Sequence, residues 1–135
     1  MKEMNLEAKL ENIPVVTGFI EEQLEALDCP MKTMMQMDVA IDEVFTNIAS
    51  YAYGAQQGAA TVRFDFDEEN RVASVTFIDS GMPFNPLESA EPDVTLSVEE
   101  RPVGGLGIFL VKKTMDEVIY VYENGQNVLT IRKKI

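Results

Sequence analysis

Hydrophobic residues follow two spacings along this chain, and each spacing predicts a different element. Alternation of apolar and polar residues near the N-terminus predicts a half-buried strand at Met4, Leu6, Ala8 and Leu10. Apolar residues at helical spacing follow and predict a first helix. We expect Asn12 to be its N-cap and Cys29-Pro30 to end it. A longer helix is predicted over about residues 32–53, and its buried face is expected to comprise Met34, Met37, Ile41, Val44, Phe45 and Ile48.

The second half of the chain returns to strand-like alternation. Strands are predicted at about residues 62–66 and 72–78, with a turn at 67–70 between them. From Asp79 to about Val103 the chain has four prolines and no sustained period, which is typical of a long loop or lid. A short helix is predicted from Gly105, followed by a hairpin around Asn124-Gly125. The order β-α-α-β-β-loop-α-β-β predicts an α+β two-layer sandwich, with a mixed, mostly antiparallel sheet and helices on one face.

Composition narrows the classes of function. A length of 135 residues predicts a single domain spanning positions 1–135. A net charge of −12, from 23 acidic and 11 basic residues, argues against direct binding to nucleic acid. The chain has no histidine, which excludes a histidine-ligated metal, a Ser–His pair and a phosphohistidine. The lone Cys29 permits no intrachain disulfide, and no apolar run approaches the ~18–20 residues that span a bilayer. We therefore expect a cytoplasmic protein with no membrane partner.

The long helix carries a carboxylate and a carboxamide one turn apart. Glu43 and Asn47 are four residues apart, so both lie on one helix face. A general base beside a neutral oxygen ligand suits a magnesium-bound phosphate better than a bare metal. The helical angles place this pair on the flank of the buried face, although ordinary surface residues would follow the same pattern. Asp38 and Asp42 point to other sides and are expected to be solvated.

Two glycine-containing segments offer complementary chemistry. Asp79-Ser-Gly81 ends a predicted strand, where a carboxylate can accept a hydrogen bond from a base and Gly81 allows close backbone approach. An ordinary turn is the alternative. Gly104-Gly105-Leu106-Gly107 opens a predicted helix, whose free N–H groups and dipole favour a phosphate; a ligand-free hinge is the alternative. In so acidic a chain, phosphate binding requires Mg²⁺ together with backbone donors.

These three segments, in this order, resemble the boxes of the GHKL ATPase superfamily, which includes histidine kinases, DNA gyrase and heat-shock chaperones. Within it the chain is most similar to the anti-sigma-factor serine kinases of bacterial partner-switching systems. The N-box corresponds to residues 42–53, the adenine box to 79–86 and the phosphate box to 104–111. The resemblance runs from about residue 5 to the end and implies a histidine-kinase-like ATP-binding domain of the Bergerat type.

The resemblance also implies a role for individual residues. Asn47 would hold the Mg²⁺ that bridges the phosphates, and Glu43 would be the general base towards a serine hydroxyl. Asp79 would accept from the adenine amino group, with Gly81 beneath the base, and Arg101 would meet the γ-phosphate. The full cofactor-binding set implied is Asn47, Asp79, Gly81, Phe84, Arg101, Gly104, Gly105, Leu106 and Gly107.

By the same resemblance, the chain is expected to bind ATP and Mg²⁺, phosphorylate a serine of an antagonist protein and sequester a sigma factor. The alternative is a non-catalytic, nucleotide-responsive binding module. The expected partners are therefore a sigma factor and an anti-sigma-factor antagonist, and a homodimer is compatible with them. The chain departs from the better-known kinases at Tyr51-Ala-Tyr53, where they carry His-Ala-Tyr, and at Gln126-Asn127, where many carry Gly-Thr.

Overall fold

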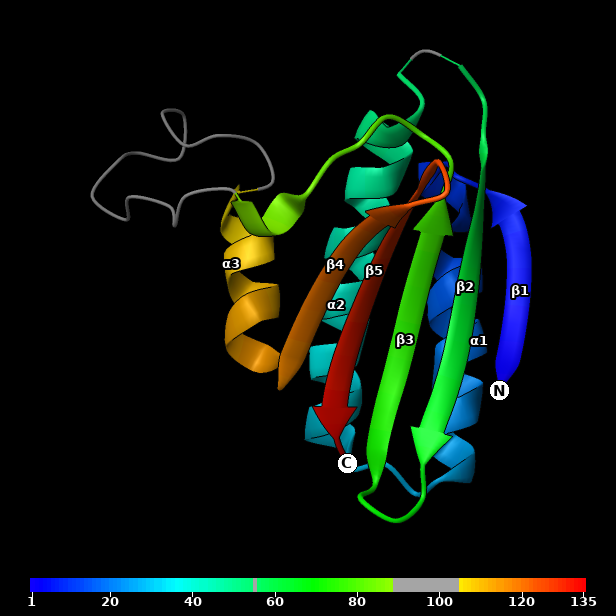
Figure 1. Cartoon of the computed structure of the whole chain (residues 1–135). Helices are drawn as coiled ribbons and strands as arrows, with labels where there is room; N and C mark the ends of the chain where they lie inside the picture. The colour runs from blue at the N-terminus through cyan, green and yellow to red at the C-terminus, as the bar shows by residue number, and fades with distance from the viewer. Residues whose placement is uncertain (55, 89–104) are drawn as a thin grey trace.

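The computed structural model of the chain describes residues 1–54, 56–88 and 105–135, and in these residues one layer of helices covers one sheet (Figure 1). The strands pair in the order β1-β2-β3-β5-β4, and each neighbouring pair is antiparallel. Their bounds are β1 Lys2–Glu7, β2 Ala59–Asp67, β3 Val72–Asp79, β4 Glu117–Glu123 and β5 Gln126–Lys134. The predicted two-layer α+β fold is confirmed, with antiparallel pairing throughout the described strands.

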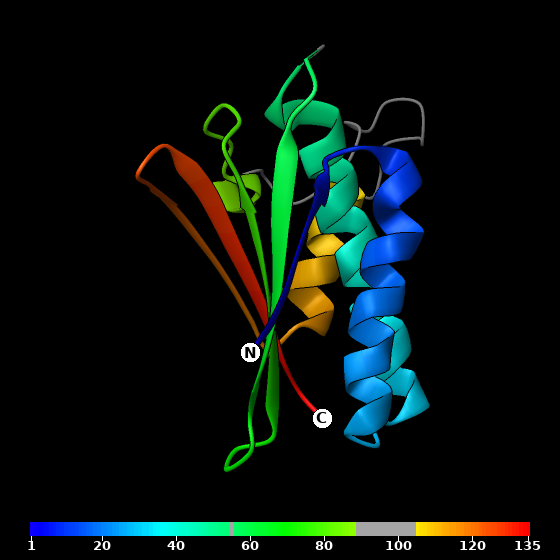
Figure 2. The ribbon, with the colours of Figure 1, turned by 90° about the vertical axis from the view of Figure 1, so that its right-hand side faces the viewer.

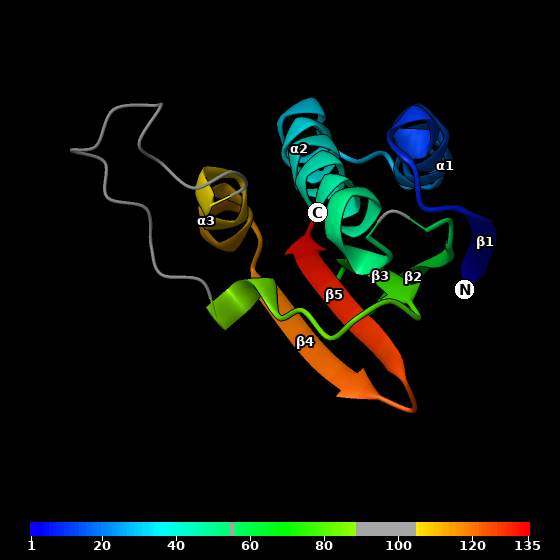
Figure 3. The ribbon, with the colours of Figure 1, turned by 90° about the horizontal axis from the view of Figure 1, so that it is seen from above.

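The three α-helices of the described residues lie on the same face of the sheet (Figures 2 and 3). They are α1 Ile13–Ala26, α2 Met31–Asn47 and α3 Gly105–Thr114, and α2 packs against both α1 and α3. Short helices follow β1 (η1, Leu10–Asn12), α2 (η2, Ile48–Ala52) and β3 (η3, Pro86–Glu88). Within the described ranges, no helix is long and apolar enough to cross a membrane.

The core lies between α2 and the covered face of the sheet. All six residues predicted for the buried face of the long helix are buried, from Met34 to Ile48. They pack on alternate residues of the central strands, which the pleat directs to the same side. The sheet residues of this cluster are Ala60, Val62, Phe64, Ala73, Val75, Phe77, Leu129 and Ile131. The period of the sequence therefore placed the core correctly.

Near the N-terminus the predicted end of the first strand is wrong, whereas the predicted start of the first helix is confirmed. The first strand ends at Glu7, and Leu10 begins η1 with half of its surface exposed instead of continuing the alternation. α1 begins at Ile13 with Asn12 at its N-cap position, as predicted, but the Asn12 side chain makes no capping hydrogen bond, and its Nδ2 donates to the carbonyl oxygen of Glu7 at 2.8 Å. This side chain therefore fastens the turn between β1 and α1, which local helix signals do not predict.

The end of the long helix also differs from the prediction. Its α-helical part stops at Asn47, and residues 48–52 form the π-helical turn η2. The backbone carbonyl of Ala52, the last residue of η2, accepts a hydrogen bond at 2.8 Å from the amide of Met82 in the segment that follows β3. This hydrogen bond links the end of the long helix to the segment 79–84.

Asp38 is not the solvated charge that its helical angle predicted. It is half-buried and lines a groove between α1 and α2 together with Glu21. Its Oδ1 is buried and has no hydrogen-bond partner among the described residues. Burial, followed by hydrogen bonding and repulsion with Glu21, raises the pKa of Asp38 to about 6. A hydrogen bond between the two carboxyls requires a proton on one of them, so the ionised pair leaves Oδ1 unpartnered. Asp42 is exposed, as predicted.

We expect Asp38→Asn to stabilise the protein near neutral pH. Because the folded-state pKa of Asp38 lies above its unfolded value, its contribution to stability is present at low pH and lost as pH rises through about 6. The amide cannot ionise, so the free energy of unfolding at about pH 7.5 should rise by about 1 kcal/mol or less for this partly exposed pair. Denaturant titration at neutral and acidic pH measures it, with Asp65→Asn, at an exposed position of β2, as control. An equal gain at both pH values would contradict the explanation.

Candidate functional site

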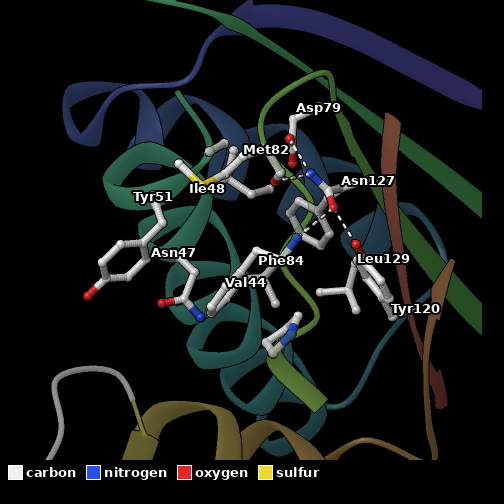
Figure 4. A pocket seen from close by; sticks show the side chains of 13 residues that line it. Val44, Asn47, Ile48, Tyr51, Asp79, Met82, Phe84, Tyr120, Asn127 and Leu129 are labelled. Carbon is white, nitrogen blue, oxygen red and sulfur yellow. Dashed lines mark hydrogen bonds between the residues drawn. The ribbon is translucent and has the colours of Figure 1, made fainter. Parts of the chain in front are cut away.

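A pocket opens where the end of α2 and η2 meet one end of the sheet (Figure 4). Its apolar walls come from α2, η2, β3 and β5, through Val44, Ile48, Phe77 and Leu129. Three polar side chains, Asn47, Asp79 and Asn127, also line it. An apolar slot with a few polar groups suits a flat, partly polar ring such as a nucleobase.

Asp79 is the buried carboxylate of this pocket. It is the last residue of β3 and only 5% exposed. Its Oδ1 accepts two hydrogen bonds, from the Gly81 amide and from Asn127 Nδ2, each at 2.9 Å. Among the described residues, no hydrogen bond reaches Oδ2. One carboxylate oxygen therefore remains available as an acceptor in a largely apolar pocket.

Asn127 is a polar residue of this pocket that the sequence analysis named only as part of the departure at Gln126-Asn127. It stands directly opposite Asp79 in the β3–β5 register and is 6% exposed. Its Nδ2 also donates to the carbonyl of Met82 at 2.9 Å, and its Oδ1 accepts from the Phe84 amide at 3.1 Å and from the Tyr120 hydroxyl. The only sequence signal was the departure at Gln126-Asn127, because nothing local indicates which strand lies opposite.

Gly81 is required by the contact between its backbone and η2. A Cβ at this position would lie 2.0 Å from the carbonyl oxygen of Ala52, which only glycine avoids. Next to it, the amide of Ser80 donates to the hydroxyl of Tyr53 at 2.8 Å. These contacts hold the segment after β3 in place. Gly81 is not among the described residues that line the pocket, and its position beneath a base stays a prediction.

The predicted base Glu43 lies against the predicted phosphate box. A Cβ built on Gly107 would stand 1.8 Å from Glu43 Oε2, so the absence of a side chain at Gly107 makes room for this carboxylate. Glu43 is half-buried, and burial first, then the nearby charge of Asp42, raises the pKa of its carboxyl. A raised pKa makes a carboxylate a better proton acceptor near neutral pH.

Asn47 connects these two regions. It is half-buried one turn beyond Glu43 and lines the pocket that contains Asp79, as Figure 4 shows. At the mouth of the same pocket the rings of Tyr51 and Phe84 lie with centroids 5.8 Å apart, both partly exposed. The helix spacing thus placed Glu43 and Asn47 correctly on the flank of the buried face.

The phosphate box is described in part. Gly105, Leu106 and Gly107 form the first turn of α3, as the glycine pattern predicted. Arg101 and Gly104 lie outside the described residues. Across the described ranges, no group of three or more acidic or cysteine side chains is arranged to hold a metal ion.

Comparison with known proteins agrees with this geometry. The model of the histidine kinase-like ATPase domain family matches residues 6–133. The serine-protein kinase RsbW of Bacillus mycoides is 29% identical over 131 residues, covering 94% of this chain and 81% of the relative. RsbW of Bacillus cereus strain B4264 is 28% identical with the same coverage.

Two solved structures share the fold. The histidine kinase domain of the blue-light activated kinase from Erythrobacter litoralis EL346 aligns with a TM-score of 0.58 and 16% identity. That alignment covers 90% of this chain and 60% of the kinase domain chain. The Acinetobacter baumannii histidine kinase AdeS aligns with a TM-score of 0.52 and 8% identity, over 99% of this chain and 68% of that chain.

Proposed function

We propose, from the premise that the chain belongs to the family of histidine kinase-like ATPase domains, that it is an ATP-dependent protein-serine kinase. In this proposal the whole chain acts as one cytoplasmic domain that binds Mg-ATP and phosphorylates an antagonist protein. It also sequesters a sigma factor in exchange with that antagonist. The relatives that match most of the chain carry the name serine-protein kinase, which supports the reaction class.

The proposed site has a base end and a phosphate end. At the base end, Asp79 Oδ2 accepts a hydrogen bond from the adenine amino group, between the apolar walls of the pocket. At the phosphate end, the start of α3 offers backbone N–H groups to the phosphates, and Asn47 is the proposed ligand of Mg²⁺. Bound Mg²⁺ would neutralise charge on the phosphates during transfer. Arg101 is proposed to meet the γ-phosphate.

Glu43 is the proposed general base. Its carboxylate takes the proton from the attacking serine hydroxyl as the serine oxygen bonds to the γ-phosphorus and the bond to the β-phosphate oxygen breaks. The products are phosphoserine and ADP. The contact between Glu43 and Gly107 is the observation that carries this proposal, because it places a carboxylate with a raised pKa beside the first turn of α3.

A non-catalytic, nucleotide-responsive binding module remains the second candidate function. Asn47 and Asp79 would suffice for such a module, whereas a half-buried carboxylate against the phosphate box adds no binding group to it. The negative charges of a bound phosphate and of a carboxylate repel each other, unless a metal ion neutralises them or the carboxylate takes up a proton. Glu43 is therefore the residue that favours the kinase over the module.

A transfer assay separates the two candidates. The purified chain is incubated with Mg²⁺, γ-labelled ATP and the antagonist encoded beside its gene, and label on the antagonist is followed with time. We expect label on one serine, lost when that serine is replaced by alanine. Tight ATP binding without transfer to this antagonist would favour the binding module. An absence of both ATP binding and transfer would contradict the nucleotide site as a whole.

A further inference from the structure

We infer that Asn127 is the positioning residue of the base pocket and sets its selectivity for a base that carries an amino group. The inference rests on the proposed nucleotide site and adds a residue to it. The observation is the set of four hydrogen bonds around one buried carboxamide, which joins β3, β4, β5 and the segment 79–84 (Figure 4).

The carboxamide of Asn127 uses all of its hydrogen-bonding capacity. Its amino group donates two bonds, to Asp79 Oδ1 and to the carbonyl of Met82. Its oxygen accepts two bonds, from the Phe84 amide and the Tyr120 hydroxyl. A carboxamide offers two donors and two acceptor positions, so none is left for a ligand. Asn127 therefore acts on a bound base through Asp79 and not by direct polar contact.

The consequence for Asp79 is that its two oxygens become different. Oδ1 already accepts from Asn127 and from the Gly81 amide, which fills its two lone-pair positions. Among the described residues Oδ2 accepts no hydrogen bond, so it is left as an acceptor for a ligand in the pocket that Asp79 lines. A base with an amino group at this position can donate to Oδ2, whereas a base with a carbonyl oxygen there would place two acceptors together. Asn127 thus holds Asp79 in the orientation that selects an adenine-like edge.

Asn127 also shapes the apolar part of the pocket. Through Met82 and Phe84 it holds both ends of the short segment that carries these pocket-lining side chains. A threonine at position 127 would offer a single hydroxyl and could not make the same four hydrogen bonds. Replacing Asn127 should therefore change the ratio of affinities for different bases. A general loss of packing would instead lower the affinity for all nucleotides alike.

Affinity ratios test the inference. ADP and the diphosphate of purine riboside, which lacks only the amino group, are titrated with Mg²⁺ into the wild type and Asn127→Leu. We expect the wild type to prefer ADP by about 10- to 100-fold, the range of one hydrogen bond to a charged group. In Asn127→Leu the preference should fall to about threefold or less. Hydrogen exchange of residues 81–84 in the ligand-free variant should also accelerate.

Two further variants complete the test. Tyr120→Phe keeps the ring and removes one donor to Asn127, so it should fold even where Asn127→Leu does not, and it should lower the preference by about 2- to 10-fold. Thr76→Val removes the 3.1 Å Thr76–Thr130 hydrogen bond between the same strands β3 and β5, and should leave the preference unchanged. If the Asn127 and Tyr120 variants lose affinity for both nucleotides equally, the inference fails while the nucleotide site stands. If the wild type binds neither nucleotide, both fail.

Discussion

Glu43→Gln is expected to reduce phosphoryl transfer to a protein serine by about 10²–10⁴-fold, the usual contribution of a general base. Glutamine keeps the shape of the side chain and its contact with Gly107, but it cannot accept the proton of a serine hydroxyl at neutral pH. Mg-ADP binding should therefore be retained. Single-turnover transfer and calorimetric titration measure the two quantities separately. An unchanged transfer rate in Glu43→Gln would remove Glu43 from the mechanism.

The pH dependence of the transfer rate gives a second test of Glu43 as the general base. Because burial and Asp42 raise the pKa of Glu43, its base form is lost as pH falls through a value above that of an ordinary glutamate. Transfer should decline below this pH. Asp42→Asn keeps the base, removes the smaller cause of the shift and should move the decline to lower pH with the plateau rate retained. Asn47→Ala should instead lose Mg²⁺-dependent binding and transfer together.

Asp79→Asn is expected to weaken Mg-ADP binding by about 10- to 100-fold. The oxygen of the new carboxamide would stay with the two donors, Asn127 Nδ2 and the Gly81 amide, and its amino group would then face the amino group of adenine. The two amino groups are both donors, so the hydrogen bond between Asp79 and adenine would be lost. The same geometry suits inosine diphosphate, whose base has a carbonyl oxygen at that position, so its affinity should rise relative to ADP.

Calorimetric titration of both nucleotides into wild type and Asp79→Asn measures this reversal. Asp65→Asn is the control, because Asp65 is an exposed carboxylate on β2 and is absent from the pocket lining. Its nucleotide preference should match that of the wild type. If Asp79→Asn and Asp65→Asn bind ADP as the wild type does, Asp79 does not contact the base.

The parts of the fold and site that the sequence predicted are those with a local period. The buried face of α2 follows helical spacing, and Glu43 and Asn47 share a flank because they are four residues apart. The hairpin at Asn124-Gly125 was predicted from its dipeptide, and both residues have the positive φ that a two-residue turn requires. In each case the geometry depends on neighbours within one turn or one hairpin.

The parts that the sequence missed depend on contacts between distant segments. Asn127 meets Asp79 across a separation of 48 residues, and only the β3–β5 register brings them together. Glu43 meets Gly107 because α2 packs against α3. Asp38 is half-buried because α1, and Glu21 with it, lies over that side of α2. None of these pairings leaves a periodic signal in the sequence.

Nucleotide binding by the unmodified protein is tested most directly by calorimetric titration with Mg-ADP, with the melting temperature followed in parallel. We expect saturable binding at one site per chain and a higher melting temperature, because a ligand that binds only the folded state stabilises it. No measurable heat and an unchanged melting temperature at high Mg-ADP concentration would contradict an ATP site between Asp79 and the start of α3.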